Sequence, residues 1–245
     1  MKLAILSDIH GNSWALSKVL KDIERRKPDL ILNLGDSLYG PLNPQETYKM
    51  IKSYNIRSIS GNEDRLIAQN IGKDHQTGTL EFVKKALKDN AIDWLISLPK
   101  TTILDCRVFM CHGTPHSDTT YLAEKIQEDS VSLNESDTMD EILRGVKQYI
   151  VFCGHSHVHR MVQTPKHTII NPGSVGCPAY EVNFPVHHKI ENFNNHAQYC
   201  FAELSDYDIT VEQVSVPYDV NKAVNCAIRN SRPDWANWLK TGRVK

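Results

Sequence analysis

Acidic, amide and imidazole side chains recur along this chain at the points where short apolar runs end. Seven of them are the candidate metal ligands: Asp8, His10, Asp36, Asn62, His112, His155 and His157. Two carboxylates, one amide and four imidazoles suit Mn²⁺, Fe²⁺, Ni²⁺ or Zn²⁺ better than Ca²⁺, which prefers an all-oxygen shell. The set therefore predicts a centre for divalent metal ions.

The size of the set predicts more than one ion, because seven ligands exceed what a single tetrahedral site needs. If one carboxylate bridges two ions, the set divides into two incomplete shells, and Asp36, in the middle of the series, is the expected bridge. Two ions about 3.5–4 Å apart form a clamp suited to displacement at phosphorus. We expect two divalent ions, Mn²⁺ first, with Fe²⁺, Ni²⁺, Zn²⁺ or Mg²⁺ as alternatives.

A strand is expected before each group of ligands. Short runs of Ile, Val and Leu alternate with helix-length segments, which is the pattern of βαβ units. The expected strands are 2–7, 30–34, 56–60, 107–111, 149–153 and 168–170, and the expected helices are 12–26, 44–54 and 79–98, the last broken near Asp89-Asn90. Because ligands bind at the carboxyl edge of such sheets, we expect the seven side chains to converge in one cleft.

Three other segments carry weaker signals. Residues 118–146 are polar and acidic and are interpreted as a loop that leads into a helix. Residues 171–174 either shape the wall of the cleft or form a tight turn. Residues 179–197 are interpreted as a polar loop whose aromatic side chains (Tyr180, Phe184, His187, His188 and Phe193) either stack on a nucleobase or pack the loop onto the sheets.

The C-terminal part is expected to be a hairpin followed by helices. Residues 198–204 and 209–216 flank a turn signal, which predicts two antiparallel strands. The last thirty residues predict one or two short helices with Trp235 and Trp238 as packing anchors. No repeat and no Gly/Ser-rich linker divides the sequence, so we expect one domain over residues 1–245.

Composition excludes several classes of protein. Lysine and arginine total 28 against 29 acidic residues, so a net charge of −1 offers no basic field for a stable nucleic-acid complex. With 40% hydrophobic residues the chain is globular in composition. No apolar run approaches the roughly 20 residues that cross a bilayer, and no signal peptide is apparent, so a cytoplasmic location without membrane contact is expected. The six cysteines lack a Cys-x-x-Cys pair and are expected to be reduced.

Five blocks of the sequence, in this order, resemble those of the calcineurin-like metallophosphoesterase superfamily. They are Ser7-Asp8-Ile9-His10-Gly11-Asn12, Leu34-Gly35-Asp36, Gly61-Asn62-Glu63-Asp64, Cys111-His112-Gly113-Thr114-Pro115 and Gly154-His155-Ser156-His157. The segments 112–115, 171–176 and 216–219 look most like the small prokaryotic branch that includes phosphodiesterases and diadenosine-tetraphosphatase-like hydrolases. The resemblance is strongest over residues 1–176 and looser in the remainder.

This resemblance implies a fold, a metal centre and an activity. The fold is a four-layer α/β/β/α sandwich with a dinuclear centre at the carboxyl edge of the strands. One ion is expected on Asp8, His10, Asp36 and His157, and the other on Asp36, Asn62, His112 and His155. A hydroxide between the ions is expected to attack phosphorus in line with the departing oxygen. Catalytic roles are implied for Asp36, Asn62 and His112, and in one interpretation for Glu63.

Glu63 departs from the family pattern, which has histidine after the asparagine ligand in many members. That histidine is usually assigned to the leaving group or to the transition state. Either Glu63 turns away and supports its surroundings, or burial and the neighbouring Asp64 keep it protonated as a general acid. The first interpretation is preferred, and it predicts that the rate depends steeply on leaving-group acidity.

We therefore expect a metal-dependent phosphoesterase that acts on a phosphodiester or a dinucleoside polyphosphate. Its partner is then a small phosphorylated substrate, with a nucleotide as one candidate. Two alternatives stay open: a phosphoprotein phosphatase, and a noncatalytic interaction scaffold on the same fold. The sequence leaves the native metal, the physiological substrate and the oligomeric state undecided.

Overall fold

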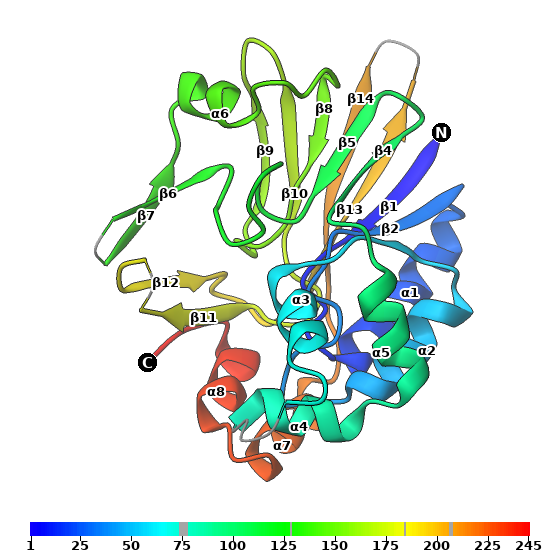
Figure 1. Cartoon of the computed structure of the whole chain (residues 1–245), viewed down its shortest axis with the longest axis vertical. Coiled ribbons are helices and arrows are strands. Elements are labelled where there is room, and N and C mark those ends of the chain that lie inside the picture. Colours follow the sequence, from blue (N-terminus) through cyan, green and yellow to red (C-terminus); the bar gives the residue numbers. More distant parts are fainter. Residues whose placement is uncertain (74–77, 128, 184, 206–207) are drawn as a thin grey trace.

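Two five-stranded β-sheets lie face to face in the computed structural model, which describes residues 1–73, 78–127, 129–183, 185–205 and 208–245 (Figure 1). The first sheet has the order β14-β13-β1-β2-β3, formed by Ile209–Val216, Ala197–Leu204, Lys2–Leu6, Leu30–Asn33 and Arg57–Ser58. The second has the order β4-β5-β8-β10-β9, formed by Thr101–Leu104, Val108–Cys111, Ile150–Phe152, Thr168–Pro172 and His159–Gln163.

Both sheets contain three parallel strands with antiparallel neighbours. Strands β1, β2 and β3 run parallel, and β13 and β14 extend that sheet antiparallel. Strands β5, β8 and β10 run parallel, and β4 and β9 are the antiparallel edges. These six parallel strands are the six that the apolar runs predict. Parallel strands are buried on both faces and therefore appear in the sequence as continuous apolar runs.

Helices complete a four-layer α/β/β/α sandwich, as expected. One outer layer consists of α1 (Ser13–Arg26), α2 (Pro44–Ser53), α3 (Asn62–Gln69), α4 (Gly78–Ala86) and α5 (Asp89–Ser97). These helices share an apolar core with Ala4 and Leu6 of β1, whereas Leu3 and Ile5 of the same strand point into the core between the sheets. On the other side, α6 (Ser136–Ile142) packs its Met139 against the second sheet.

Two further hairpins and two helices lie at the end of the sandwich where the parallel strands end (Figure 1). The hairpins are β6 (Glu124–Gln127) with β7 (Ser130–Leu133), and β11 (Ala179–Val182) with β12 (His188–Glu191). The helices are α7 (Val220–Arg229) and α8 (Pro233–Thr241). They form a separate apolar cluster that includes Trp235 and Trp238, so the two tryptophans are packing anchors as predicted.

Several predictions about the connecting segments are wrong. Residues 118–146 contain the β6–β7 hairpin before α6, and residues 179–197 contain the β11–β12 hairpin instead of a loop. The β6–β7 hairpin is largely exposed, and the β11–β12 hairpin combines the buried Ala179, His188 and Ile190 with polar residues, so neither carries a continuous apolar signal. Strands β4 and β9 and helix α3 were not predicted either.

The other predicted elements are confirmed, with bounds that differ by at most two residues at either end. The expected helix over 79–98 divides into α4 and α5. The C-terminal hairpin is β13–β14, although residues 206–207 of its turn lie outside the described part. All six cysteines are unpaired. No described helix combines the length and the apolar character needed to span a membrane.

Candidate metal centre

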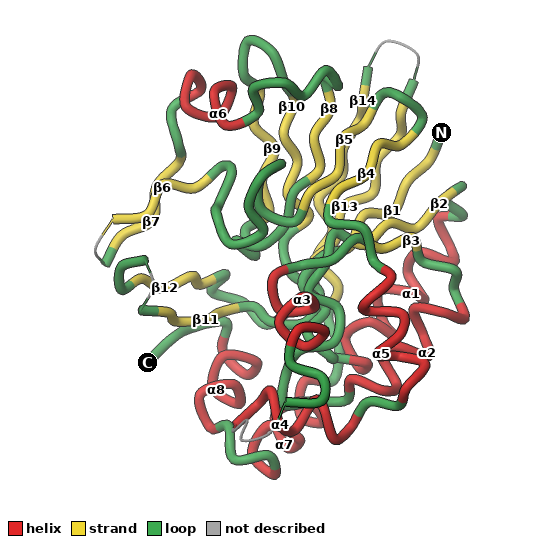
Figure 2. The backbone as a smooth tube through the Cα atoms, viewed as in Figure 1, coloured by secondary structure: helices red, strands yellow, loops and turns green. Residues whose placement is uncertain are grey.

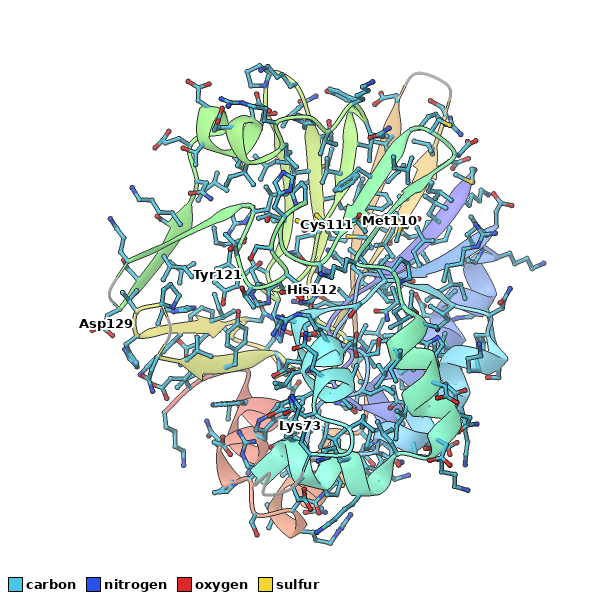
Figure 3. The ribbon with its side chains drawn as sticks, in the orientation of Figure 1. Lys73, Met110, Cys111, His112, Tyr121 and Asp129 are labelled. Carbon is cyan, nitrogen blue, oxygen red and sulfur yellow. The ribbon has the colours of Figure 1, made fainter. Side chains whose placement is uncertain are left out.

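The loops after five parallel strands bring the seven candidate ligands to one place. Asp8 and His10 follow β1, and Asp36 follows β2. Asn62 is the first residue of α3, which follows β3, and His112 follows β5; His155 and His157 follow β8. Figure 2 shows these loops meeting between the ends of the strands and α3, and Figure 3 labels His112 at that junction.

The backbone of this region is unusual, because five of the seven candidate ligands have a left-handed conformation. The residues and their φ angles are Asp8 (53°), His10 (51°), Asp36 (51°), His155 (67°) and His157 (58°). Non-glycine residues rarely adopt positive φ, and clusters of them mark binding or catalytic sites. Hydrogen bonds between neighbouring loops hold the geometry, such as His10 N to Asp36 O at 2.9 Å and Gly154 N to His112 O at 2.7 Å.

One group of ligands consists of Asp8, His10 and His157, whose ligand atoms lie within 4.8 Å of one another. His10 donates its Nδ1–H to Tyr39 O at 3.0 Å, and His157 donates its Nδ1–H to Cys177 O at 2.7 Å. In a neutral imidazole this leaves a lone pair on Nε2. The two Nε2 atoms are only 3.1 Å apart.

Asp8 brings a third acceptor to the same point. Its Oδ1 lies 3.3 Å from His157 Nε2 and has no hydrogen-bond partner among the described residues. Its Oδ2 accepts a hydrogen bond from His155 N at 3.2 Å. Acceptor atoms that converge in this way repel one another unless a proton or a metal cation lies among them. The donor set therefore fits a divalent metal ion.

A second group consists of Asp36, His112 and His155, again within 4.8 Å. His112 donates its Nδ1–H to Leu34 O at 2.8 Å, so its Nε2 faces Asn62 Oδ1 at 3.0 Å and Asp36 Oδ2 at 3.4 Å. Like Asp8, Asp36 uses one oxygen for the backbone, since Oδ1 accepts from Glu63 N at 2.8 Å. Asp36 also lies within 4.8 Å of His10, so it contacts both groups.

The electrostatics of the site favour positive charge. Burial alone raises the pKa of Asp8, but His157, His112 and His10 outweigh it and hold that pKa well below its usual value. Burial opposes a charge on His10 as well, yet Glu63, Asp36 and Asp8 raise its pKa to about 9. Burial and the nearby His112 lower the pKa of His155 to about 4, which keeps this ring neutral as a nitrogen donor.

Glu63 does not turn away from the site. Its side chain lines the cleft, and its Oε2 lies 3.0 Å from His10 Nδ1. Burial, together with Asp36 and Asp64, outweighs the attraction of His10 and raises the pKa of Glu63 to about 7. The preferred interpretation, in which Glu63 turns away, is therefore wrong: the carboxyl group contacts His10 and faces the space in which a substrate would lie.

Buried polar residues other than the candidate ligands hold the loops together. Asp64 accepts hydrogen bonds from Ser37 N at 2.9 Å and from Gly61 N at 3.2 Å, so it fixes the loops after β2 and β3. Asn171 donates to Gly154 O at 2.9 Å, and Ser174 donates to Asp8 O at 2.8 Å. Residues 171–174 do not line the cleft, so they support the ligand loops from behind instead of shaping its wall.

A cavity of about 550 Å³ opens over the ligands. Five candidate ligands line it, together with Tyr121 from the segment before β6, Tyr180 from β11, and Trp235 and Trp238 from α8. The aromatic residue Tyr180 from the segment 179–197 faces this cavity, as does His188, whereas Phe193 is 64% exposed and lies elsewhere. Phe184 lies outside the described residues.

Comparisons with known proteins agree with this architecture. The sequence model of the calcineurin-like phosphoesterase superfamily domain matches residues 1–191. The chain is 28% identical over 257 residues to the uncharacterized protein MJ0912 of Methanocaldococcus jannaschii. The alignment covers 95% of this chain and 94% of that protein.

Two solved structures show the same fold. A metallophosphoesterase from Sphaerobacter thermophilus has a TM-score of 0.78 at 22% identity, over 99% of this chain and 100% of that one. The hypothetical protein PH1004 from Pyrococcus horikoshii has a TM-score of 0.75 at 21% identity, over 100% of this chain and 99% of that one.

Proposed function

Because the chain belongs to the calcineurin-like phosphoesterase superfamily, a family of metal-dependent phosphoester hydrolases, we propose that it hydrolyses a phosphodiester or a dinucleoside polyphosphate. The observation that carries this proposal is the convergence of acceptor atoms at the end of the parallel strands. His10 Nε2 and His157 Nε2 face each other at 3.1 Å beside the unpartnered Asp8 Oδ1.

Two divalent ions are proposed to occupy this centre. Asp8, His10, Asp36 and His157 would hold one, and Asp36, Asn62, His112 and His155 would hold the other. Mn²⁺ is proposed as the native metal, because the mixture of imidazole nitrogens and carboxylate oxygens suits a first-row cation. When bound, such ions supply an activated water and neutralise charge on the phosphoryl oxygens.

The residues of the chain itself then bind and orient the substrate. The ligand side chains are fixed by backbone hydrogen bonds, so little reorganisation accompanies the reaction. Glu63 is proposed to position His10 through its contact with Nδ1, and not to protonate the leaving group. Asn62 and His112 lie side by side and face the same space as Asp36.

Residues 1–245 are proposed to form one domain. Helix α8 lies beyond the matched residues 1–191, yet its Trp235 ring packs edge-on against the His10 ring at 5.7 Å. Helix α7 contacts α1, and α8 contacts β11. The C-terminal helices thus complete the same cleft. The site gives no support to the scaffold alternative, because all seven candidate ligands are assembled.

The test is hydrolysis of bis-p-nitrophenyl phosphate by protein treated with a chelator and then supplied with Mn²⁺. We expect activity to return with the metal, and Asp36→Asn to lower turnover by about 10²–10³-fold or more. Asp140→Asn is the matched control, since Asp140 is a buried carboxylate that pairs with His167 away from the cleft. Circular dichroism checks that both variants are folded.

Two outcomes would contradict the proposal. One is turnover that survives chelation or the Asp36→Asn substitution. The other is activity toward phosphopeptides without activity toward diesters or nucleotides, which would identify a phosphoprotein phosphatase.

A further inference from the structure

Aromatic rings from outside the βαβ framework pack against three of the candidate imidazole ligands. The ring of Trp235 in α8 lies 5.7 Å from that of His10, and the ring of Tyr180 in β11 lies 4.6 Å from that of His157. The ring of Tyr121, which precedes β6, lies 4.7 Å from that of His155. Trp238 continues the row, 5.8 Å from Trp235. We call Tyr121, Tyr180, Trp235 and Trp238 the aromatic collar.

Hydrogen bonds hold the tyrosines of the collar in place. The hydroxyl groups of Tyr121 and Tyr180 are 2.5 Å apart. His188 donates its Nδ1–H to Val186 O, so its Nε2 accepts from the Tyr121 hydroxyl at 3.1 Å. Tyr180 also reaches His155 O at 3.2 Å. Tyr121 thus joins the segment before β6 to the β11–β12 hairpin, above which Figure 3 labels it.

The tryptophan half of the collar is also ordered. The Arg232 guanidinium lies 5.7 Å from the centre of the Trp235 ring, and its Nε donates to Asp234 at 2.9 Å. Both tryptophans are buried, at 5% and 8% exposure, yet both line the cavity. A ligand would therefore meet rigid aromatic walls there, and binding would cost little side-chain entropy.

The cavity is larger than a phosphoryl group needs. Its volume of about 550 Å³ lies within the range, about 300–1,000 Å³, of sites that enclose a whole small molecule. Beyond the metal ligands, the lining combines the collar and a few aliphatic residues (Ile126, Val182 and Pro185) with polar side chains: Thr119, Glu181, Asn183 and Arg232. A planar heterocycle with polar edges matches such walls, whereas a hydrocarbon chain would leave the polar groups without partners.

We propose that the aromatic collar binds a nucleobase of the substrate while the reacting phosphorus lies over the candidate ligands. This inference rests on the proposed function and narrows it to nucleotide esters. Arg232, Trp235 and Trp238 lie beyond residues 1–191, which match the family model, so this part of the wall comes from the segment that follows the match.

The test compares two diesters with the same leaving group, so that leaving-group acidity cancels. One is the p-nitrophenyl ester of thymidine 5′-monophosphate, and the other is methyl p-nitrophenyl phosphate, each with Mn²⁺. We expect the thymidine ester to have a KM lower by about tenfold or more, the size of one stacked base. Trp238→Leu should bring the ratio of the two KM values close to one, and Trp238→Phe should keep most of it.

Trp94→Leu is the matched control. Trp94 in α5 packs against Tyr48 at 5.6 Å and does not line the cavity, so the KM ratio should survive this substitution. Because the two KM values of each ratio are measured on the same protein, a smaller folded fraction in a variant does not change that ratio. A second measurement uses only the wild-type protein, in case Trp238→Leu does not fold. Quenching of its tryptophan fluorescence compares the affinity for thymidine 5′-monophosphate with the affinity for methyl phosphate.

The outcomes separate the two proposals. Three kinetic results would overturn the collar as a base site and leave the proposed phosphoesterase activity intact. They are equal KM values for the two esters in the wild-type protein, a KM ratio that is unchanged in Trp238→Leu, and a KM ratio that Trp94→Leu abolishes as completely as Trp238→Leu does. Equal affinity for the two phosphate monoesters in the fluorescence titration would do the same. Failure to hydrolyse either ester with Mn²⁺ would overturn the proposed function itself.

Discussion

His10 Nε2 lies 3.1 Å from His157 Nε2, although each ring donates its Nδ1–H to a backbone carbonyl. Each ring therefore turns its Nε2 toward the other, and because nearby carboxylates raise the pKa of His10 to about 9, this Nε2 carries a proton in the metal-free protein. Asp8 Oδ1 lies beside them, 3.3 Å from His157 Nε2, and has no hydrogen-bond partner among the described residues. The site thus attracts positive charge, and a divalent cation is expected to displace that proton when it binds.

The first prediction is that Mn²⁺ stabilises the protein. At 100 times its dissociation constant, a ligand that binds only the folded state adds about 2.7 kcal/mol to the free energy of unfolding. For a chain of this length that corresponds to roughly 5–10 °C in Tm. Thermal unfolding with Mn²⁺ and with a chelator measures the shift, and Asp8→Asn should remove most of it.

His167→Gln is the control for this shift. His167 is also a buried histidine, but its Nδ1 pairs with Asp140 at 2.9 Å, away from the cleft. The variant is expected to be less stable than the wild-type protein and to keep the full metal-induced shift. An unchanged shift in Asp8→Asn would contradict the assignment of Asp8 as a ligand.

The second prediction concerns Gly35, which precedes the candidate bridging residue. Its φ is +106°, and a Cβ there would lie 2.5 Å from Gly61 N and 2.9 Å from His112 Nδ1. Gly35→Ala should therefore destabilise the fold and displace His112. Displacement of a catalytic group by 1 Å can cost about 10²-fold in rate, and a loss of that size is expected.

Gly145→Ala separates backbone strain from the steric clash. Gly145 has a φ of +94°, and a Cβ there would meet nothing within 4 Å. This variant should lose about 1–2 kcal/mol of stability, the cost of a left-handed backbone, and keep its turnover. Denaturant unfolding and steady-state kinetics of both variants check the comparison, and equal effects would refute the steric argument.

The third prediction is a steep dependence of rate on leaving-group acidity. If Glu63 positions His10 and does not protonate the leaving oxygen, aryl methyl diesters should react more slowly by at least about 10²-fold as the leaving-group pKa rises from about 7 to about 10. Glu63→Gln should lower every rate by a similar, modest factor. A flat series in the wild-type protein that becomes steep in Glu63→Gln would identify Glu63 as a general acid instead.

The sequence predicted the strands that carry the site, for a physical reason. Strand β1 buries Leu3 and Ile5 between the sheets and Ala4 and Leu6 under the helices, so both faces are apolar and the run is continuous. Edge strands lack this signal. In β4, for example, Ile103 is 52% exposed and follows two threonines, and the strand was not recognised.

The candidate ligands could be found from their types and positions, but their geometry could not. Asp8, for example, has a left-handed backbone whose N–H and C=O bond to Gly35 O and Gly176 N, in loops that are far apart in the sequence. Trp235 was correctly expected to pack, yet nothing local indicates that its helix folds back against His10. Long-range placement of this kind depends on the tertiary fold, so the position of the aromatic collar over the candidate ligands could not be predicted from the sequence.

The central claim is that two neighbouring ions are held at the carboxyl ends of the parallel strands. Its most direct test is a crystal structure with Mn²⁺ in which anomalous scattering locates the metals. We predict two peaks about 3.5–4 Å apart on either side of Asp36, one beside His10 and His157 and the other beside His112 and His155. A single peak, or none among these side chains, would contradict the account.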